Sequence, residues 1–344
     1  MSSFCIKEEN IMNNIFYNIA GLLSQRAVLN FVIGNRGGGK SFSGKRLVIN
    51  RFKKSGAQFV WVRRYQTEID TLTDFFADIK ELYPEDELKM EGNTCYINGE
   101  PAGWLIALTT SQKLKSVAFP KVRTIIFDEF IIDKGKLGYL KNEVQVFLEL
   151  FETIARMRDN VTAIFFGNAI SIVNPYFIYF GVTPDLNKRY TKKNGICIEH
   201  YFNQDFVDKK ASTRFGKLIA GTAYGEYNML NKFLRDSDSF IIEKRPQGAS
   251  LKIQQFILDG EKFSLWQDTK RGEWYIDNNY EPNFGTYRTW ITNPIDMDDK
   301  DKSHILLKKN SAILKRLREI AERGDLYFNN QNSKQKFYEI LLTF

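Results

Sequence analysis

The sequence predicts an α/β protein with three parts: a domain built on a mostly parallel sheet, a small helical linker and a smaller α+β domain. Its 344 residues suffice for about two domains, each with a core of its own. Between residues 28 and 168, short apolar runs alternate with amphipathic stretches, which is typical of βαβ units. After residue 239 apolar residues recur at every second position, as in a strand meander. We therefore expect the parts to span residues 1–205, 206–236 and 237–344.

The strands expected in the first domain are short apolar runs. They lie at Val28–Ile33, Gln58–Arg63, Trp104–Leu108, Arg123–Phe127 and Val161–Phe166. Apolar residues spaced i, i+3 and i+4 predict the helices between them. These helices lie at Ser41–Lys53, Thr67–Leu82 and Asn142–Arg158. The pair Asn98-Gly99 predicts a tight turn between strands at Thr94–Ile97 and Ala102–Leu108, and this hairpin would lie at the edge of the sheet.

The rest of the chain is expected to add an exposed turn, the linker and a second sheet. The turn is Thr191–Gly195. The linker is helical in composition and carries glycines at positions 216, 221 and 225. In the last domain, strands are predicted at Phe240–Lys244, Lys252–Leu258, Phe263–Gln267 and Glu273–Ile276, and a basic amphipathic helix at His304–Arg323.

The composition excludes several classes of protein. Hydrophobic residues make up 43% and charged residues 26%, which excludes a disordered chain. No apolar stretch reaches the roughly 20 residues that cross a bilayer, and acids stand where a secretory signal has lysines, so a cytoplasmic protein without a membrane partner is expected. Three cysteines and two histidines, far apart, form no zinc framework. The net charge of +8 favours a polyanionic partner such as nucleic acid.

The most informative motif follows the first predicted strand. The segment GNRGGGKS matches G-x-x-x-x-G-K-[ST], the pattern of a phosphate-binding loop or Walker A element. Its glycines let backbone N–H groups surround phosphates, and the helix that follows presents its N-terminus to them. Lys40 would bind the β- and γ-phosphates of ATP and Ser41 would hold Mg²⁺, whereas the alternative is a glycine-rich turn without a nucleotide. The expected ATP-binding residues are Gly34, Asn35, Arg36, Gly37, Gly38, Gly39, Lys40 and Ser41.

Polar side chains end two further predicted strands. Asp128 and Glu129 follow the apolar run Thr124–Phe127, which is typical of a Walker B element. Asp128 would hold Mg²⁺ through water, and Glu129 would orient and polarise the attacking water. An exposed acidic strand end is the alternative, which the loop upstream disfavours. Asn168 would face the γ-phosphate as a sensor, or it forms a turn.

Basic side chains are the remaining candidates. Arg156 and Arg158 lie at the end of the predicted helix that precedes the strand Val161–Phe166. A cation there would act as an arginine finger on a neighbouring subunit's γ-phosphate, or it would only complement the helix C-terminus. A ring could also grip DNA phosphates or contact its next subunit through loop cations. The candidates for this role are Arg63, Arg64, Lys113 and Lys115.

Beyond these motifs, the chain resembles the genome-packaging ATPases of phi-29-like tailed bacteriophages, which are related to the FtsK/HerA ATPases. The matching stretches extend from residue 29 to residue 245 and lie partly outside the nucleotide motifs. They are LNFVIGNRGGGKS (29–41), INRF (49–52), QFVWVRRY (58–65), TIIFDEF (124–130), NPYF (174–177), PDLNKR (184–189), TRFGKLIAGTAYGE (213–226) and FIIEKR (240–245).

The resemblance implies an additional-strand (ASCE) ATPase domain, a helical linker and a C-terminal domain like an RNase H-like nuclease that has lost its acids. It also implies a homopentameric ring at the portal of a procapsid in the host cytoplasm. There ATP hydrolysis would drive double-stranded DNA inward, and a packaging RNA can mediate attachment. By position, Arg156 falls on the family's trans-acting arginine finger, and Lys115 falls on a lysine that acts between subunits or near DNA.

Two departures from the family qualify this reading. Gln66 stands where the family can place a lysine that touches DNA. Asp259, Asp268 and Asp277 form no pattern typical of a two-metal site, so no DNA cleavage is expected. The predicted function is a ring ATPase that translocates double-stranded DNA. The alternatives are a DNA helicase or terminase-like nuclease-translocase, and a binding protein whose loop only locks an assembly.

Overall fold

The computed structural model divides the chain into two compact units. It describes residues 16–132, 139–168, 174–182, 184–185, 187–222, 225, 240–258, 260–280, 288–296 and 304–343. The first unit comprises Met1–Asp133, Gln145–Ser171 and Pro184–Leu234. The second comprises Lys134–Val144, Ile172–Thr183 and Arg235–Phe344. This division differs from three consecutive parts, because two short segments from before residue 205 group with the C-terminal residues.

Side-chain contacts explain why these two segments group with the C-terminal residues. Helix α6 (Pro175–Phe180) places Ile178 in the core of the second unit. The buried carboxylate of Glu143 accepts a hydrogen bond from the Tyr176 hydroxyl at 3.2 Å and so joins the two inserted segments. Both segments therefore belong to the second unit by their contacts, although they precede residue 205 in the sequence.

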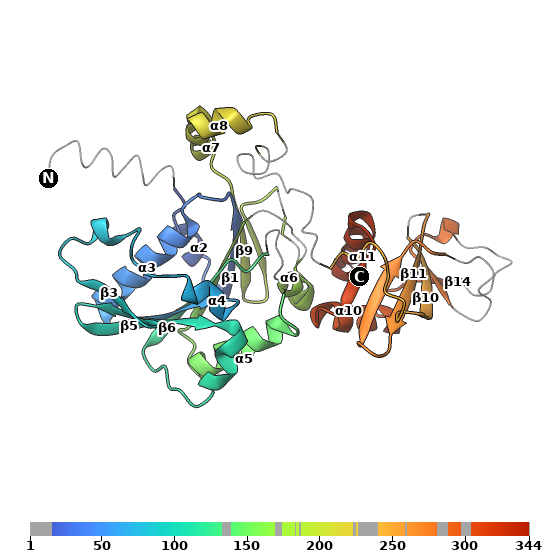
Figure 1. Ribbon diagram of the computed structural model, residues 1–344, viewed down its shortest axis with the longest axis horizontal. Helices are drawn as coiled ribbons and strands as arrows, with labels where there is room; N and C mark the ends of the chain where they lie inside the picture. The colour runs from blue at the N-terminus through green and yellow to red at the C-terminus, as the bar shows by residue number, and fades with distance from the viewer. Residues whose placement is uncertain are drawn as a thin grey trace. The chain divides into compact units, whose positions relative to one another are not determined.

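The first unit contains a nine-stranded sheet (Figure 1). Its central strands are parallel to one another, and antiparallel hairpins extend both edges. This confirms the predicted α/β class with a mostly parallel sheet. In spatial order the strands are β3 (Leu88–Glu91), β4 (Thr94–Ile97), β5 (Glu100–Ala107), β2 (Gln58–Arg63), β6 (Val122–Asp128), β7 (Thr162–Asn168), β1 (Leu29–Gly34), β9 (Ile196–Tyr201) and β8 (Tyr190–Lys193).

Helices cover both faces of this sheet (Figure 1), so its central strands are buried along most of their length. Helix α3 (Lys40–Ser55) packs Val48 and Ile49 in one core cluster with Ile126, Ile164 and Phe166. Helix α5 (Glu143–Ala155) lies on the opposite face, where the Phe147 ring stacks on Phe127 at 5.9 Å. The shorter helical elements are α2 (Ala20–Leu23), α4 (Gln66–Asp70), η1 (Lys80–Leu82), η2 (Leu108–Leu114), α7 (Gln204–Ser212) and α8 (Arg214–Ile219).

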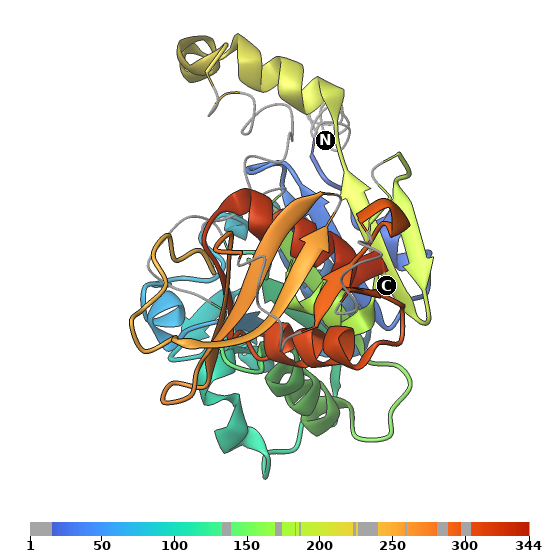
Figure 2. The ribbon, with the colours of Figure 1, turned by 90° about the vertical axis from the view of Figure 1, so that its right-hand side faces the viewer.

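The second unit contains a six-stranded sheet and several helices (Figure 2). Strands β10 (Leu251–Leu258), β11 (Glu261–Asp268) and β12 (Glu273–Asp277) form an antiparallel meander, and the other strands join it in parallel. In spatial order the strands are β14 (His304–Leu306), β13 (Thr289–Ile291), β10 (Leu251–Leu258), β11 (Glu261–Asp268), β12 (Glu273–Asp277) and β15 (Leu326–Phe328). Besides α6, the helical elements among the described residues of this unit are η3 (Pro294–Asp296), α10 (Ala312–Glu322) and α11 (Gln331–Thr343). Phe337 of α11 contacts the rings of Phe256 and Phe263, which closes the core.

The predicted helix Thr67–Leu82 is wrong over most of its length. Regular helix is confined to α4 and η1, because polar side chains between them bond the local backbone instead. The Asp74 carboxylate accepts the N–H of Phe76 at 2.9 Å, and the Thr71 hydroxyl donates to the carbonyl of Glu68 at 3.0 Å. The segment still buries Phe75 and Phe76 against the sheet.

Three other predictions need correction. Residues 191–195 are not only a turn, because β8 and β9 form a hairpin around Asn194-Gly195, both of which have positive φ. The helix predicted from His304 begins at Ala312, because His304–Leu306 pairs with β13 as a strand. The strand predicted at Phe240–Lys244 is reduced to a bridge between Ile241 and Phe328. The hairpin at Asn98-Gly99 lies at the sheet edge as predicted.

Candidate nucleotide-binding site

The candidate site lies at the carboxyl ends of three neighbouring strands. β6, β7 and β1 are adjacent in the sheet, and Gly34 at the end of β1 is in register with Asn168 at the end of β7. Asp128 ends β6 and pairs with Phe166 one strand away. Parallel strands bring their carboxyl ends to one edge of the sheet, where α/β proteins bind their ligands. The loop, Asp128 and Asn168 are therefore brought together by strand order.

The loop between β1 and α3 has a conformation that requires glycine. Gly37 and Gly39 have φ of +79° and +84°, which side-chain-bearing residues rarely adopt. At Gly34 a Cβ atom would lie 2.9 Å from the carbonyl oxygen of Tyr201 on β9. Helix α3 begins at Lys40, directly after Gly39. The loop thus leads into a helix N-terminus, a common arrangement for binding anions.

A cavity of about 250 Å³ opens between this loop and Asp128 and Glu129, the twin acids. Among the residues expected to bind ATP, Arg36 to Ser41 line it, whereas Gly34 and Asn35 lie next to it as hydrogen-bond acceptors of Lys40. Phe42, Phe166 and Gly167 complete the wall, and no sequence motif pointed to them. The full set of lining residues is Arg36, Gly37, Gly38, Gly39, Lys40, Ser41, Phe42, Asp128, Glu129, Phe166, Gly167 and Asn168.

Lys40 is buried and held by oxygen atoms at the edge of the sheet. Its Nζ donates to the carbonyls of Gly34 at 3.0 Å and Asn35 at 2.7 Å, and to Oδ1 of Asn168 at 3.3 Å. Burial lowers the pKa of Lys40 to about 8, although the carboxylates of Asp128 and Glu129 act in the opposite direction. An anion that enters the cavity would therefore stabilise the charged form of Lys40, which burial disfavours.

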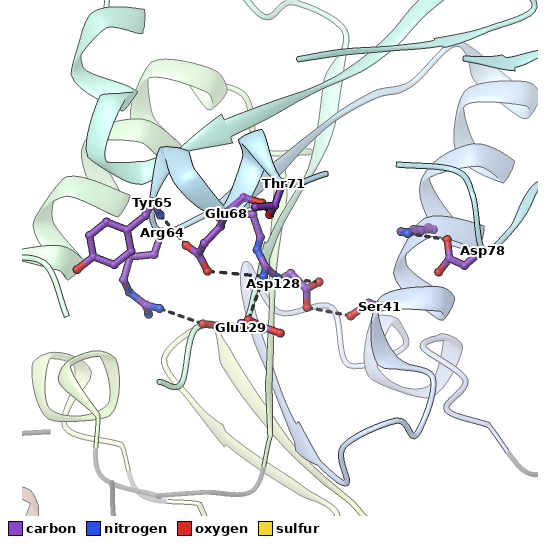
Figure 3. A network of polar contacts seen from close by, with 10 residues as sticks. Ser41, Arg64, Tyr65, Glu68, Thr71, Asp78, Asp128 and Glu129 are labelled. Carbon is purple, nitrogen blue, oxygen red and sulfur yellow. Dashed lines mark hydrogen bonds and ion pairs between the residues drawn. The ribbon is translucent and has the colours of Figure 1, made fainter. Parts of the chain in front are cut away.

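Ser41 and Asp128 form a pair of oxygen ligands facing each other (Figure 3). The Ser41 hydroxyl donates to Oδ1 of Asp128 at 2.9 Å. Burial raises the pKa of Asp128, and the nearby charge of Arg63 counteracts this rise. A hydroxyl and a carboxylate are ligands that Mg²⁺ accepts, together with waters and phosphate oxygens. The residues present therefore fit the predicted Mg²⁺ with a nucleoside triphosphate.

Glu129 is exposed, and Arg63 holds its carboxylate. Arg63 Nη2 lies 2.9 Å from Oε2 of Glu129, and Arg63 Nη1 lies 3.4 Å from Oδ2 of Asp128. Glu129 has a φ of +61°, an unfavourable conformation for a residue with a side chain. Arg63, predicted to contact DNA or a neighbouring subunit, instead pairs with both acids within its own chain.

The prediction for Arg64 is wrong for a similar reason. Its side chain is only 4% exposed, and its guanidinium donates to the carbonyl of Glu129 at 3.1 Å (Figure 3). It also donates to the carbonyl of Phe130 at 2.7 Å. A cation buried in this way cannot reach the phosphates of DNA. Arg64 instead supports the backbone that carries the twin acids.

The other predicted cations lie outside the cavity. Arg156 is exposed at the end of α5 with a φ of +42°, and donates to the carbonyl of Val117 at 3.3 Å. Arg158 donates to the carbonyls of Pro120 and Val122, both at 2.8 Å, so a structural role fits it better. Lys115 pairs with Glu149 at 3.3 Å. Lys113 lines a separate, mainly apolar cavity that also contains Gln66.

The acids singled out in the C-terminal unit have structural partners. Asp268 accepts the backbone N–H groups of Lys270 and Arg271 in a turn. Asp277 accepts from the Trp266 indole at 2.8 Å and pairs with Arg245. Asp259 lies outside the described residues. Within the described part of the chain, no three histidine, cysteine or acidic side chains gather as a metal site, and no helix is long and apolar enough to cross a membrane.

Comparison with known proteins assigns the family. Residues 11–343 match the model of the podovirus DNA encapsidation protein (Gp16). The chain belongs to this family. It is 40% identical to the DNA packaging protein of Bacillus phage phi29 over 329 residues, which cover 95% of this chain and 97% of that protein. It is 41% identical to the DNA packaging protein of Bacillus phage B103 over 322 residues, or 93% and 98% of the two chains.

Solved structures of family members agree with the fold. A chain of the phi29 viral genome packaging motor assembly is 39% identical, with 95% of this chain and 98% of that chain covered and a TM-score of 0.58. The N-terminal domain of the DNA packaging ATPase from phi29 is 46% identical, with 56% and 98% covered and a TM-score of 0.53. These matches confirm the resemblance to packaging ATPases that the sequence motifs indicated.

Proposed function

We propose that this chain is the ATPase of a viral DNA-packaging motor, which hydrolyses ATP to move double-stranded genomic DNA through a portal into a procapsid. One observation carries the proposal. The glycine-rich loop and the twin acids, which are far apart in the sequence, line one cavity in a chain of the DNA encapsidation family. The Ser41–Asp128 hydrogen bond joins them across 87 residues.

The loop and its neighbours would bind the nucleotide. Backbone N–H groups of the loop and the Lys40 ammonium would hold the phosphates, while Ser41 and Asp128 would hold Mg²⁺. The metal ion supplies neutralisation of the triphosphate charge. Asn168 already contacts Nζ of Lys40, so it would share the γ-phosphate end of the cavity with that lysine.

Glu129 would act as the base for hydrolysis. Its carboxylate would accept a hydrogen bond from the attacking water and take its proton as the water oxygen bonds to the γ-phosphorus. The bond between the γ-phosphorus and the β–γ bridging oxygen would break in the same step, and ADP would leave with that oxygen. The ion pair with Arg63 holds this carboxylate at 2.9 Å, so Glu129 must loosen that contact before it can orient the water. In the structure Arg63 therefore restrains the base, and release of this contact would free Glu129 for the water.

Assembly would supply what the single chain lacks at the site. We propose a homopentameric ring in which Arg156, exposed at the end of α5 and outside its own cavity, reaches the γ-phosphate of the next subunit. Lys113 and Lys115 would act between subunits or at the DNA. The ring would attach to the portal of the procapsid in the host cytoplasm, and a packaging RNA would mediate attachment.

The C-terminal unit would be an RNase H-like domain without nuclease activity. A meander with parallel strands added beside its first strand supports this reading of the fold. The structural partners of Asp268 and Asp277 support the absence of a two-metal site among the described residues. Cutting of DNA by the purified protein in Mg²⁺ or Mn²⁺ would contradict this part of the proposal.

The decisive experiment measures ATP hydrolysis with and without long double-stranded DNA. Wild-type protein should hydrolyse ATP faster when DNA is present. Glu129→Gln should bind ATP normally but lose turnover by about 10²- to 10⁴-fold, the usual contribution of a general base. Glu91→Gln, at the far edge of the same sheet, is the matched control and should retain wild-type turnover.

Three results would contradict the proposal. Normal turnover by Glu129→Gln would remove this residue from catalysis. An absence of DNA-stimulated turnover in wild-type protein would favour a loop that only locks an assembly. Strand separation or strand cutting in the same reactions would favour a helicase or a terminase-like nuclease instead.

A further inference from the structure

Helix α7 packs directly on the glycine-rich loop. It follows β9 and begins at Gln204, after Asn203, whose side chain accepts the N–H of Phe206 at 3.3 Å. The buried Phe206 ring lies beside Gly37, where an added Cβ atom would be 3.9 Å from it. It also approaches the Phe16 ring at 6.2 Å between centroids. Helix α7, which follows β9 in the chain, thus packs against the glycine-rich loop through Phe206.

Lys210 of this helix reaches the loop backbone. Its Nζ donates to the carbonyl oxygen of Arg36 at 3.2 Å and lies 5.4 Å from the centre of the Phe206 ring. Phe206 and Lys210 are four residues apart, so they share one face of α7. The side chain of Lys210 is partly buried on that face, whereas the neighbouring Lys209 is exposed. Lys210 therefore faces the loop and contacts it, whereas the adjacent Lys209 faces solvent.

Three cations converge on the loop from two parts of the chain. Burial lowers the pKa of Lys210, and the charge of Arg36 lowers it further. The charge of Lys210 in turn contributes to the lowered pKa of Lys40. Like charges at one loop repel each other until an anion neutralises them, so the arrangement favours a polyanionic ligand over an empty cavity.

We propose that Lys210 is a further positioning residue of the nucleotide site: from helix α7 it holds the loop at Arg36 and adds positive charge that strengthens binding of the nucleotide's phosphates. The proposal rests on the proposed function, because it assumes that the cavity binds a nucleoside triphosphate. By linkage, a nucleotide that gains affinity from Lys210 also stabilises α7 against the loop. Nucleotide occupancy and the order of α7 then depend on each other.

The test compares Lys210→Met, Lys210→Arg and the matched control Lys209→Met in the full chain. A fluorescent, non-hydrolysable ATP analogue with Mg²⁺ is the probe for affinity. Loss of one charge-assisted contact should weaken binding about tenfold in Lys210→Met. Lys210→Arg should stay within about threefold of wild type, and Lys209→Met should not change. KM for ATP should rise in Lys210→Met while kcat changes less than about twofold, as for a lost ground-state interaction.

Hydrogen exchange of the α7 amides supplies a second readout. The analogue should slow exchange across Gln204–Ser212 in wild-type protein and in Lys210→Arg, but not in Lys210→Met. Binding by Lys210→Met within about twofold of wild type would overturn the proposal. Equal losses in Lys210→Met and Lys210→Arg would also overturn it, because charge would then not be the basis. If wild-type protein binds no nucleotide, the proposed function fails before this question arises.

Discussion

Nucleotide affinity should fall steeply above pH 8, because Lys40 loses its proton there. In the nucleotide-free protein, burial lowers the pKa of Lys40 from 10.5 to about 8. A bound triphosphate favours the charged lysine and raises this pKa again. Raising the pH from 7 to 9.5 should therefore weaken binding by about 30-fold, or about 2 kcal/mol. The phosphates themselves do not contribute, because they are fully ionised above pH 8.

Two measurements test this prediction. Fluorescence titration of the ATP analogue across pH 7 to 9.5 gives the affinity. Calorimetry in buffers of different ionisation heat should detect uptake of about 0.9 proton per nucleotide at pH 9. Both measurements are made in the Lys210→Arg variant. The substitution removes a second titrating lysine near the loop and replaces it with a guanidinium that stays charged. Constant affinity across this range without proton uptake would refute the reasoning about Lys40.

The same lowered pKa has an opposite consequence for stability without nucleotide. The unfolded chain binds more protons than the folded chain between pH 8 and pH 10.5, the folded and unfolded pKa of Lys40. The contribution of Lys40 to the free energy of unfolding therefore increases as the pH rises through this window. Rising pH thus stabilises the empty site while it weakens the affinity for nucleotide.

Two further predictions concern arginines near the twin acids and at the end of α5. Arg64→Met should lower the free energy of unfolding by about 1–3 kcal/mol, because the carbonyls of Glu129 and Phe130 lose their donor. Chemical denaturation measures this change, and an unchanged midpoint would mean that Arg64 is dispensable for the fold. Arg156→Ala should lose about 10³-fold or more of its turnover with ATP binding intact, as for a missing arginine finger. Mixed rings with Glu129→Gln subunits should regain part of that turnover, whereas a lack of complementation would favour a role at the helix C-terminus.

The sequence predicted the strands of the central sheet well, and the physical reason is their burial. Strands covered on both faces are continuous apolar runs, and polar residues mark where they end. The prediction of Gln58–Arg63 agrees with β2, and Asp128 ends β6. Strand β9 was missed because Glu199 and His200 interrupt its apolar pattern. The buried Glu199 is satisfied by the Tyr17 hydroxyl at 2.7 Å, which local sequence cannot reveal.

The core of the candidate site was equally accessible from the sequence. The glycine-rich loop, Lys40 and Ser41 form one continuous motif, and the acids follow a recognisable strand. The roles of the cations around this core could not be predicted from the sequence. Arg63 and Arg64 occur in a polar stretch that resembles any exposed strand end, but the edge of the neighbouring β6 supplies acids to one and carbonyls to the other. Lys210 lies 174 residues from its partner Arg36 and belongs to no motif.

The sequence by itself determined the chemistry of the site, because the residue types and spacings of the loop and of the acidic strand end are local properties of the chain. The tertiary structure alone decided which cations serve that chemistry. Strand order places β2 beside β6 and β9 beside β1, so it determines which distant side chains meet at the sheet edge. Local periodicity fixes which residues point inward, but pairing between distant polar groups depends on how the strands are ordered, and no short segment of the chain specifies that order.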